Sequence, residues 1–312
     1  MSVPVFTGRQ VENAVSPDRA VEAVRSAFVA HANGEWTMPP KVYVTNYPAG
    51  DFRAMPALGG GHALLKWVTS FPGNPLQGLP TVTGVVLVSD AGNGQLRAVL
   101  DAAAVTALRT GAAAVLAAEV LARPDARTAA VIGAGVNGRA AARTLLARGR
   151  EVTVRDVNED RARRVAAELG CLVASSREEA LAAEIVVTVT PGHDVVIGDG
   201  VLREGQHVSL MGADGPGKAE TTDRVLDRAR LFCDDWEQAS HGGELAHAVE
   251  HGVVSRADVT AIGEVLAGRA DGRLGDGDIT MFDSTGLAIQ DLAIALAALE
   301  RADEIDLPRL EL

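Results

Sequence analysis

The sequence predicts an α/β protein in which a doubly wound parallel sheet of the Rossmann type is combined with a discontinuous α+β domain. An apolar run ends in a glycine fingerprint, Gly133-x-Gly135-x-x-Gly138, and continues into an alanine-rich helix pattern. Strand-like and helix-like segments alternate from residue 128 to residue 233, which is typical of a parallel sheet covered on both faces. Residues 41–101 instead contain short β-type runs separated by Gly, Pro, Asn and Asp.

The fingerprint predicts a dinucleotide site. Gly133 permits a tight turn, Gly135 lets the backbone approach a pyrophosphate, and Gly138 lets the helix pack close to the strand. A glycine-rich turn between two buried elements is the alternative, but a second strand-like run ends in Asp156 about 20 residues further on, where an acid holds a ribose hydroxyl. Asp156 would repel a 2′-phosphate, which favours NAD over NADP. Arg155 could accept that phosphate, but we interpret it as a solvated strand residue.

Length and composition set further limits. A chain of 312 residues is long enough for two domains, and a net charge of −12 argues against a nucleic-acid or anionic-membrane surface. We find no apolar stretch long enough to span a bilayer and no signal-peptide pattern, and we expect a cytoplasmic protein. Cys171 and Cys233 are too few for a disulfide framework or zinc site. His247 and His251 are one helical turn apart, but we see no nearby acidic third ligand, so we interpret them, with His241, as solvated helix residues.

The first part of the chain predicts a helix followed by an antiparallel sheet. Ser16, Pro17 and Asp18 are an N-cap, an N1 proline and a first-turn acid, and apolar residues recur at helical spacing up to Gly34. Five β-type runs follow, at 42–47, 52–58, 64–71, 81–89 and 95–100. Residues 90–94 form a good hairpin connection between the last two runs.

The second part predicts where the domains divide. A helix at 102–122 ends at the Arg123-Pro124-Asp125 turn, where we place the boundary. A strand at 279–282 precedes a long apolar helix from residue 287 that has no strand after it and is free to return to the first domain. The predicted domains are therefore residues 1–122 with 287–312, for substrate binding and dimerisation, and residues 123–286, for NAD binding. Ligands of parallel sheets lie at the carboxyl ends of strands, which here include Thr190 and Asp214.

Three residues are candidates for chemistry. Arg109 lies in an alanine-rich helix, where a buried charge is costly unless paired, and it indicates either a site for a substrate carboxylate or an internal ion pair. Lys66 lies in an apolar strand-like run, so burial could lower its pKa into the range for proton transfer, although strict alternation could equally point it outward. Asp214 could reach the cleft or serve as an Asx-turn residue.

Lysine is scarce in this chain. Of the 29 residues that are Lys or Arg, only Lys41, Lys66 and Lys218 are lysines, and all three lie in motifs containing glycine or proline. We interpret them as positions where a guanidinium cannot replace an amine that can lose its proton. Chance survival of surface lysines is the alternative.

Several motifs make the chain resemble the ornithine cyclodeaminase and mu-crystallin family, and within it the archaeal-type alanine dehydrogenases. They occur in order over nearly the whole chain: Met-Pro-Pro-Lys-Val-Tyr at 38–43, Leu-Arg-Thr-Gly-Ala-Ala at 108–113, Gly-Ala-Asp-Gly-Pro-Gly-Lys at 212–218, Glu-Gln-Ala-Ser-His-Gly-Gly-Glu at 237–244, and Phe-Asp-Ser-Thr-Gly-Leu-Ala-Ile-Gln-Asp at 282–291.

The resemblance implies roles for individual residues. Lys41, Arg53 and Arg109 would surround the substrate carboxylate, Lys66 would be the catalytic lysine, and Asp214 would act beside it on water or the amine. The resemblance also implies a homodimer built through the sheet of the first domain. It implies NAD contacts from Thr110, Val136, Asn137, Asp156, Lys218 and Ser284. These add to the fingerprint glycines and to Thr190 at the strand end, which were named above.

One position discriminates within the family. Where this chain has Arg53, ornithine cyclodeaminases carry a glutamate that holds the distal amine of the substrate, and a cation there would repel ornithine. The sequence therefore predicts NAD-dependent oxidative deamination of a small L-amino acid, alanine to pyruvate and ammonia. The alternatives are a cyclodeaminase, an NAD(P)H-dependent imine reductase, or a nucleotide-binding protein without enzymatic activity.

Overall fold

The computed structural model describes residues 2–192, 194–215 and 217–312 and divides the chain into two compact units. The first comprises residues 1–109 and 287–312, and the second residues 110–286. The chain returns to the first unit at Leu287. It first passes between the units inside helix α3 (Ala102–Leu121), whereas the sequence analysis placed that boundary at the turn after residue 122. The reason is that the second half of α3 is bound to the second sheet, where Ser209 Oγ donates to the Ala114 carbonyl at 3.1 Å.

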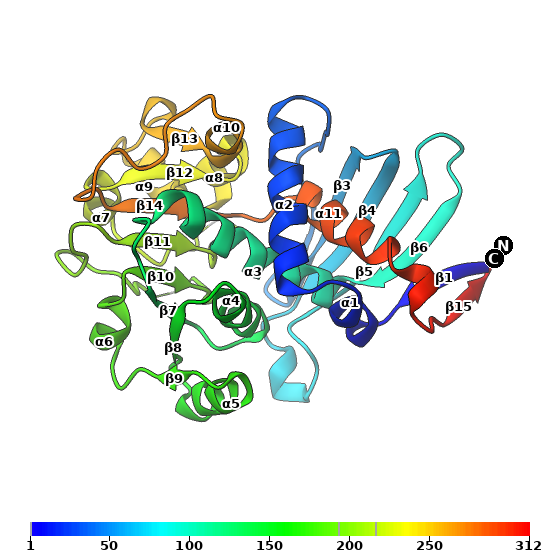
Figure 1. Cartoon of the computed structure of the whole chain (residues 1–312), viewed down its shortest axis with the longest axis horizontal. Helices are drawn as coiled ribbons and strands as arrows, with labels where there is room; N and C mark the ends of the chain where they lie inside the picture. Colours follow the sequence, from blue (N-terminus) through cyan, green and yellow to red (C-terminus); the bar gives the residue numbers. More distant parts are fainter. Residues whose placement is uncertain (1, 193, 216) are drawn as a thin grey trace. The chain divides into compact units, whose positions relative to one another are not determined.

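The first unit is built on a seven-stranded sheet in the order β15-β1-β6-β5-β4-β3-β2 (Figure 1). Neighbouring strands are antiparallel except β1 and β6, which are parallel. The five predicted β runs and the hairpin between the last two are confirmed, whereas strands β1 and β15 at the chain ends were not predicted. The strands are β1 (Ser2–Phe6), β2 (Val42–Asn46), β3 (Gly50–Gly59), β4 (His62–Ser70), β5 (Val82–Asp90), β6 (Leu96–Asp101) and β15 (Arg309–Glu311).

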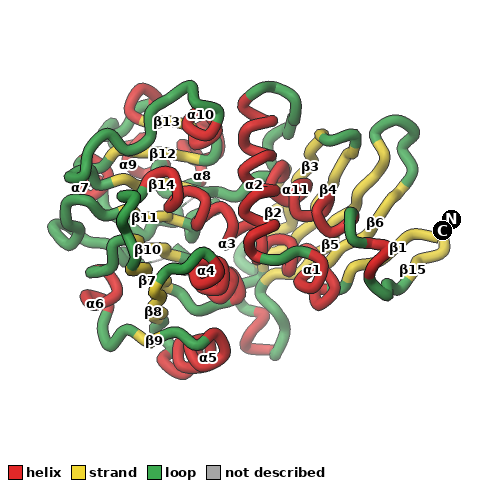
Figure 2. The backbone as a smooth tube through the Cα atoms, viewed as in Figure 1, coloured by secondary structure: helices red, strands yellow, loops and turns green. Residues whose placement is uncertain are grey.

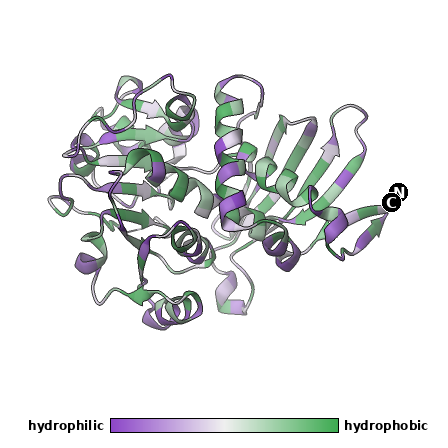
Figure 3. Ribbon diagram, in the orientation of Figure 1, coloured by the Kyte–Doolittle hydropathy of each residue, from purple (hydrophilic) through white to green (hydrophobic). Residues whose placement is uncertain are grey.

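This sheet has one buried and one exposed face, because successive side chains of a strand point to opposite sides. On β4, Leu64, Lys66 and Val68 are buried, whereas Leu65 and Trp67 are exposed. Helix α11 (Ala288–Leu299) packs on β3 and β4 and against α2 (Pro17–Ala32). Figure 3 shows the difference between these helices: α11 is mostly hydrophobic, and α2 carries hydrophilic residues as well. The unit is completed by α1 (Gly8–Ala14) and the 3-10 turns η1 (Asn74–Gln77) and η3 (Ala302–Glu304).

The second unit contains an eight-stranded parallel sheet in the order β13-β12-β14-β11-β10-β7-β8-β9. The order reverses at β7, which has β8 on one side and β10 on the other. Such a switch point opens a crevice at the carboxyl ends of the strands, where doubly wound sheets bind ligands. The strands are β7 (Thr128–Ile132), β8 (Glu151–Arg155), β9 (Leu172–Val173), β10 (Ile185–Thr188), β11 (His207–Leu210), β12 (Arg230–Cys233), β13 (Val259–Ala261) and β14 (Thr280–Asp283).

Helices alternate with strands from β7 to β12 (Figure 2), as the sequence predicted for residues 128–233, except between β10 and β11, where the described residues form no helix. Strands β10 and β11 are buried at every position, as in the centre of a sheet covered on both faces, although β11 carries the polar residues His207 and Ser209. The segment between β12 and β14, where only the surroundings of His241, His247 and His251 were expected to be helical, adds β13 and several short helices. The helices are α4 (Val136–Ala147), α5 (Glu159–Leu169), α6 (Arg177–Leu181), α7 (Asp223–Asp227), α8 (Trp236–Gly242), α9 (Ala246–Glu250), η2 (Arg256–Asp258) and α10 (Ile262–Leu266).

Helix α3 corrects one expectation from the sequence. By length and composition its residues Ala102–Leu121 could cross a membrane, contrary to the expectation that no stretch is long enough. In the structure, 78% of its apolar window is buried inside the protein. Its hydrophobic residues are therefore accounted for by packing in a protein core.

Candidate active site

Lys66 is a fully buried amine on the inner face of the first sheet. It is 1% exposed, because the alternation on β4 points it inward and turns its neighbour Trp67 to the opposite face. Its Nζ lies 2.6 Å from Asp291 Oδ2 and donates to Thr106 Oγ1 at 3.3 Å. Burial lowers the pKa of Lys66 to about 8, against the opposing effect of Asp291 and with a further lowering by Arg109. The inward orientation and a lowered pKa are as the sequence allowed, but Trp67 is not the cause.

Asp291 joins Lys66 to Arg109. It lies in the first turn of α11 and is completely buried, and its Oδ1 is 3.6 Å from Arg109 Nε. One carboxylate thus faces two cationic side chains, so the cluster of three carries a net charge of +1 while Lys66 is protonated. A buried cluster with excess positive charge favours binding of an anion, such as a carboxylate. The two sequence-based interpretations of Arg109, ion pair and anion site, are therefore compatible.

Arg53 is already engaged by a neighbouring acid. Its Nε donates to Asp51 Oδ1 at 2.6 Å and its Nη2 to Asp51 Oδ2 at 3.2 Å, and its guanidinium lies 5.4 Å from the centre of the Tyr43 ring. Both partners are buried. The expectation that Arg53 presents an uncompensated cation is therefore corrected, because Asp51 neutralises it. Lys41 lies just ahead of β2 and is half-buried.

The glycine fingerprint forms a backbone cradle after β7. A Cβ on Gly133, whose φ is +106°, would lie 2.3 Å from the Val189 carbonyl oxygen, and a Cβ on Gly138 would lie 1.7 Å from the Gly133 carbonyl oxygen. By contrast, a Cβ on Gly135 would meet nothing within 4 Å. The first and third glycines are thus required by close packing, whereas the middle one leaves open space at the start of the 12-residue helix α4. An open, N–H-lined helix start of this kind fits a pyrophosphate.

Asp156 lies directly after β8, as predicted. Its Oδ2 accepts from the Ala134 amide of the glycine loop at 2.7 Å, and its Oδ1 accepts from the Asn158 amide at 2.8 Å. Arg161, from α5, approaches Oδ2 at 3.4 Å. The carboxylate is therefore held in a fixed orientation beside the cradle, where a ribose would follow a pyrophosphate. Arg155 is half-buried, and Arg161 is the cation in contact with this acid.

The carboxyl ends of β10 and β11 are tied together by Glu220. Its carboxylate accepts from Thr188 Oγ1 at 2.6 Å, from the Thr190 amide at 2.9 Å and hydroxyl at 2.6 Å, and from the Gly212 amide at 3.2 Å. Burial raises the pKa of Glu220 to about 7, opposed by the threonine hydrogen bonds and supported by Glu244. Thr190, predicted to contact the cofactor, thus has its hydroxyl turned to Glu220, which the sequence did not single out.

Asp214 and Lys218 lie on the loop after β11 and form an ion pair, with Nζ 2.6 Å from Oδ1. Both side chains are partly exposed. The structure therefore brings together one predicted catalytic residue and one predicted cofactor contact.

The remaining predicted cofactor contacts lie in two environments. Gly135 and Val136 are exposed and Asn137 is half-buried at the start of α4. Thr110 is buried, and its hydroxyl has no hydrogen-bond partner among the described residues. Ser284 is also buried, and its hydroxyl donates to Asp234 Oδ2 at 3.0 Å. The exposed backbone of the α4 start fits a phosphate more directly than the buried Ser284 hydroxyl does.

Known proteins resemble this chain over nearly its whole length. The model of the ornithine cyclodeaminase/mu-crystallin family matches residues 3–305. The chain belongs to this family. The alanine dehydrogenase of Archaeoglobus fulgidus is 44% identical to this family member over 309 residues, which cover 97% of this chain and 96% of that protein.

Solved structures of family relatives share the fold. An archaeal alanine dehydrogenase dimer with bound NAD is 42% identical, covers 100% of this chain and 99% of its own, and superposes with a TM-score of 0.94. The Δ1-pyrroline-2-carboxylate reductase of Thermococcus litoralis, in complex with NADH and L-proline, is 28% identical, with coverage of 97% and 98% and a TM-score of 0.90. The predicted family and fold class are confirmed. The relatives differ in their reactions, so they do not fix the substrate.

Sequence reasoning missed three buried acids, Asp51 and Asp291 in the first unit and Glu220 in the second. Asp51 could have been found, because a residue two positions before Arg53 on a strand must share its face. Asp291 gave a weaker signal, because it is a lone acid within an apolar segment. Glu220 gave none, because it lies among polar residues, three positions before Asp223. Only their burial distinguishes them from surface residues.

Proposed function

We propose that this family member is an NAD-dependent oxidoreductase that deaminates a small L-amino acid, with alanine as the first candidate, to the keto acid and ammonia. The observation that supports this most is the buried cluster of Lys66, Asp291 and Arg109. An amino acid presents an ammonium that must lose a proton and a carboxylate that needs a cation. Lys66, with a pKa of about 8, can take the proton, and Arg109 can bind the substrate carboxylate; both side chains contact Asp291.

The cofactor fits the second unit. The cradle around Gly135 would hold the pyrophosphate, and Asp156 would hold the adenosine ribose. Val136 and Asn137 lie at the same helix start and would contact the pyrophosphate as well. The further proposed cofactor contacts are Thr110, Thr190, Lys218 and Ser284. When bound, NAD supplies an acceptor for the hydride that leaves Cα. The fixed carboxylate of Asp156 favours NAD over NADP, although Arg161 beside it supplies a positive charge.

The protein's own residues would manage protons and orientation. Neutral Lys66 accepts a proton from the substrate ammonium, so that loss of hydride from Cα leaves a protonated imine. Arg109, with Lys41 and Arg53 as further proposed contacts, would hold the carboxylate and thereby fix Cα. Water then adds to the imine carbon and ammonium leaves, with Asp214 proposed to orient that water.

One observation supports a second candidate. Because Asp51 neutralises Arg53, repulsion of a distal ammonium is weaker than the sequence implied, and Asp51 itself offers a buried carboxylate. A diamino acid such as ornithine could place its distal amine there, and attack of that amine on the imine would give a ring. The chain would then be a cyclodeaminase, with no net production of NADH.

We also propose a homodimer formed through the exposed face of the first sheet. The exposed face carries a continuous set of apolar side chains on neighbouring strands β2 to β5, and such a patch is unusual on a monomer. The similar archaeal alanine dehydrogenase is itself a dimer. The exposed apolar residues that the strand register places on this face are Val42, Val44, Leu58, Leu65, Trp67 and Val85. A cytoplasmic location completes the proposal, since both cysteines are free, as in reducing compartments.

The proposal is tested by mixing the protein with NAD or NADP and each of the twenty amino acids, plus ornithine, and following absorbance of the reduced nicotinamide. Alanine or another small amino acid should produce NADH. Lys66→Arg should still bind NADH but lose about two to four orders of magnitude in turnover, because arginine cannot release its proton. Proline formed from ornithine without net NADH would establish the cyclodeaminase instead. NADH binding without turnover of any substrate, in either direction, would contradict an enzymatic role.

A further inference from the structure

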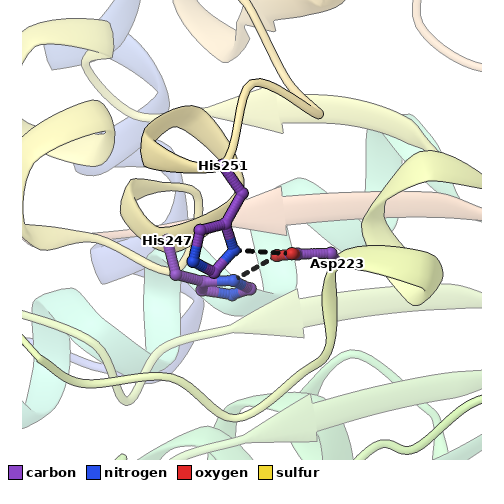
Figure 4. A group of neighbouring side chains, drawn as sticks. All are labelled: Asp223, His247 and His251. Atoms are coloured by element: carbon purple, nitrogen blue, oxygen red, sulfur yellow. Dashed lines mark hydrogen bonds and ion pairs between the residues drawn. The ribbon is translucent and has the colours of Figure 1, made fainter.

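A second cluster of side chains, none of them assigned a role above, lies in the second unit. Figure 4 shows His247, from α9, and His251, which directly follows that helix, with their rings directed at Asp223 at the start of α7. The expectation that no acidic third ligand lies near these histidines is wrong, whereas His251 is exposed, as expected of a solvated residue. The acid comes from a different helix, 24 residues before His247, so local spacing could not reveal it.

The three side chains converge closely, at hydrogen-bond distances. Asp223 Oδ1 lies 2.6 Å from His247 Nδ1 and Asp223 Oδ2 lies 2.7 Å from His251 Nδ1, and one ligand atom from each residue lies within 4.8 Å of the other two. Ligand atoms of a tetrahedral zinc ion are about 3.4 Å apart, given metal–ligand distances of about 2.1 Å. Small rotations of the three side chains would therefore admit an ion.

The carboxylate of Glu244, near the other ring nitrogen of His247, also supports a metal site. Glu244 Oε1 lies 3.9 Å from His247 Nε2, the ring nitrogen that faces away from Asp223 and is buried without a hydrogen-bond partner in the described structure. Glu244 is itself fixed, since its Oε1 accepts from the Thr221 amide at 2.6 Å and hydroxyl at 2.7 Å. Metal-binding histidines typically direct their second nitrogen at such a carboxylate, which sets the tautomer.

Charge and exposure also suit a cation. Asp223 and Glu244 supply two negative charges to two imidazoles, which matches a divalent ion. The adjacent cation, Arg224, is directed to Asp199, with Nη1 3.4 Å from Oδ2. His251 is exposed and His247 is half-buried, so an ion has a path of entry and a position for a water ligand.

We propose that Asp223, His247 and His251 bind a divalent transition-metal ion of the zinc type, with Glu244 positioning His247. The ion would join α7 to α9. Through Glu244, which also accepts from the Glu220 amide at 2.8 Å, it would stabilise the segment that carries Glu220. Because the unfolded chain does not hold the three ligands together, binding should raise the stability of the folded protein.

The test uses the untagged full-length protein, treated with a chelator and then titrated calorimetrically with zinc chloride. We expect one equivalent to bind and to raise the melting temperature. His251→Gln should weaken zinc binding at least about tenfold without unfolding the protein, since this side chain is exposed. Cobalt(II) should give the absorption bands of a four-coordinate nitrogen and oxygen site in the wild type and not in His251→Gln.

His241→Gln is the matched control, because His241 is an exposed histidine on α8 that bonds only locally, to Glu237 and Ser240 among the contacts seen. It should bind zinc as the wild type does. His247→Gln should abolish binding, and its fold is checked by NADH affinity. The proposal is overturned if the wild type binds no zinc, or if His251→Gln binds zinc as tightly as His241→Gln. In that case Asp223 only accepts hydrogen bonds from the two imidazole rings.

Discussion

Replacing Lys66 with methionine or with arginine tests how strongly burial perturbs its amine, whatever the substrate is. The pKa of Lys66 falls from 10.5 to about 8 on folding, with burial as the main cause. Between these two values the unfolded chain holds a proton on this amine and the folded protein does not. The unfolded state then binds more protons, so the free energy of unfolding rises with pH across this window. Below pH 8 the amine is protonated in both states and contributes no slope.

The size of the effect follows from the shift. Each pKa unit corresponds to about 1.4 kcal/mol, so a shift of this size makes the wild type gain about 3 kcal/mol of unfolding free energy between pH 8 and pH 10.5, relative to a variant that does not titrate there. Methionine is never charged and arginine is always charged in this range. The two variants differ in overall stability, since arginine keeps a charge opposite Asp291, but both should lack the rise.

The assay is urea unfolding at several pH values from 7 to 10.5, followed by tryptophan fluorescence. Trp36 and Trp67 lie in the first unit and Trp236 in the second, so a Trp236→Phe background makes the signal report on the unit that contains Lys66. Other groups that titrate in this range are common to all three proteins and cancel in the differences. If the wild-type minus variant difference stays constant with pH for both variants, Lys66 is not a perturbed amine, and its proposed role as a base fails with it.

Three further predictions concern the cofactor and the dimer. Gly138→Ala should lower the stability of the second unit by about 1–3 kcal/mol or more in thermal or urea unfolding, because its Cβ would lie 1.7 Å from the Gly133 carbonyl oxygen. Gly135→Ala should fold normally but lose NADH affinity in a fluorescence titration. Equal stability of the two variants would contradict the assigned packing. Asp156→Ala should weaken NADH binding at least about tenfold and reduce the preference for NADH over NADPH, and an unchanged preference would show that this acid does not face the ribose. Trp67→Lys should convert the dimer to a monomer in light scattering, while Leu172→Lys, an exposed apolar residue of the second unit, should not; a dimeric Trp67→Lys protein would place the interface elsewhere.

The sequence by itself determined the features that depend on local pattern. The glycine fingerprint, the alternation of β-type runs and the Ser16 cap, whose Oγ accepts from the Arg19 amide at 3.2 Å, each follow from a few consecutive residues and appear where expected. The family motifs likewise indicated the candidate residues. Local pattern also left the direction of Lys66 open, because alternation fixes which residues share a face but not which face is covered.

The tertiary structure decided which charges meet. Asp291 reaches Lys66 only because α11, at the far end of the chain, packs on β3 and β4, and Asp223 reaches His247 only because α7 and α9 lie together. The strand pairing of β1 with β15 and the place where α3 passes from one unit to the other have the same origin. These pairings depend on how segments distant in sequence are folded together. Burial, which sets the pKa of Lys66 and the cost of leaving a charge without a partner, follows from the same packing and not from any short stretch of sequence.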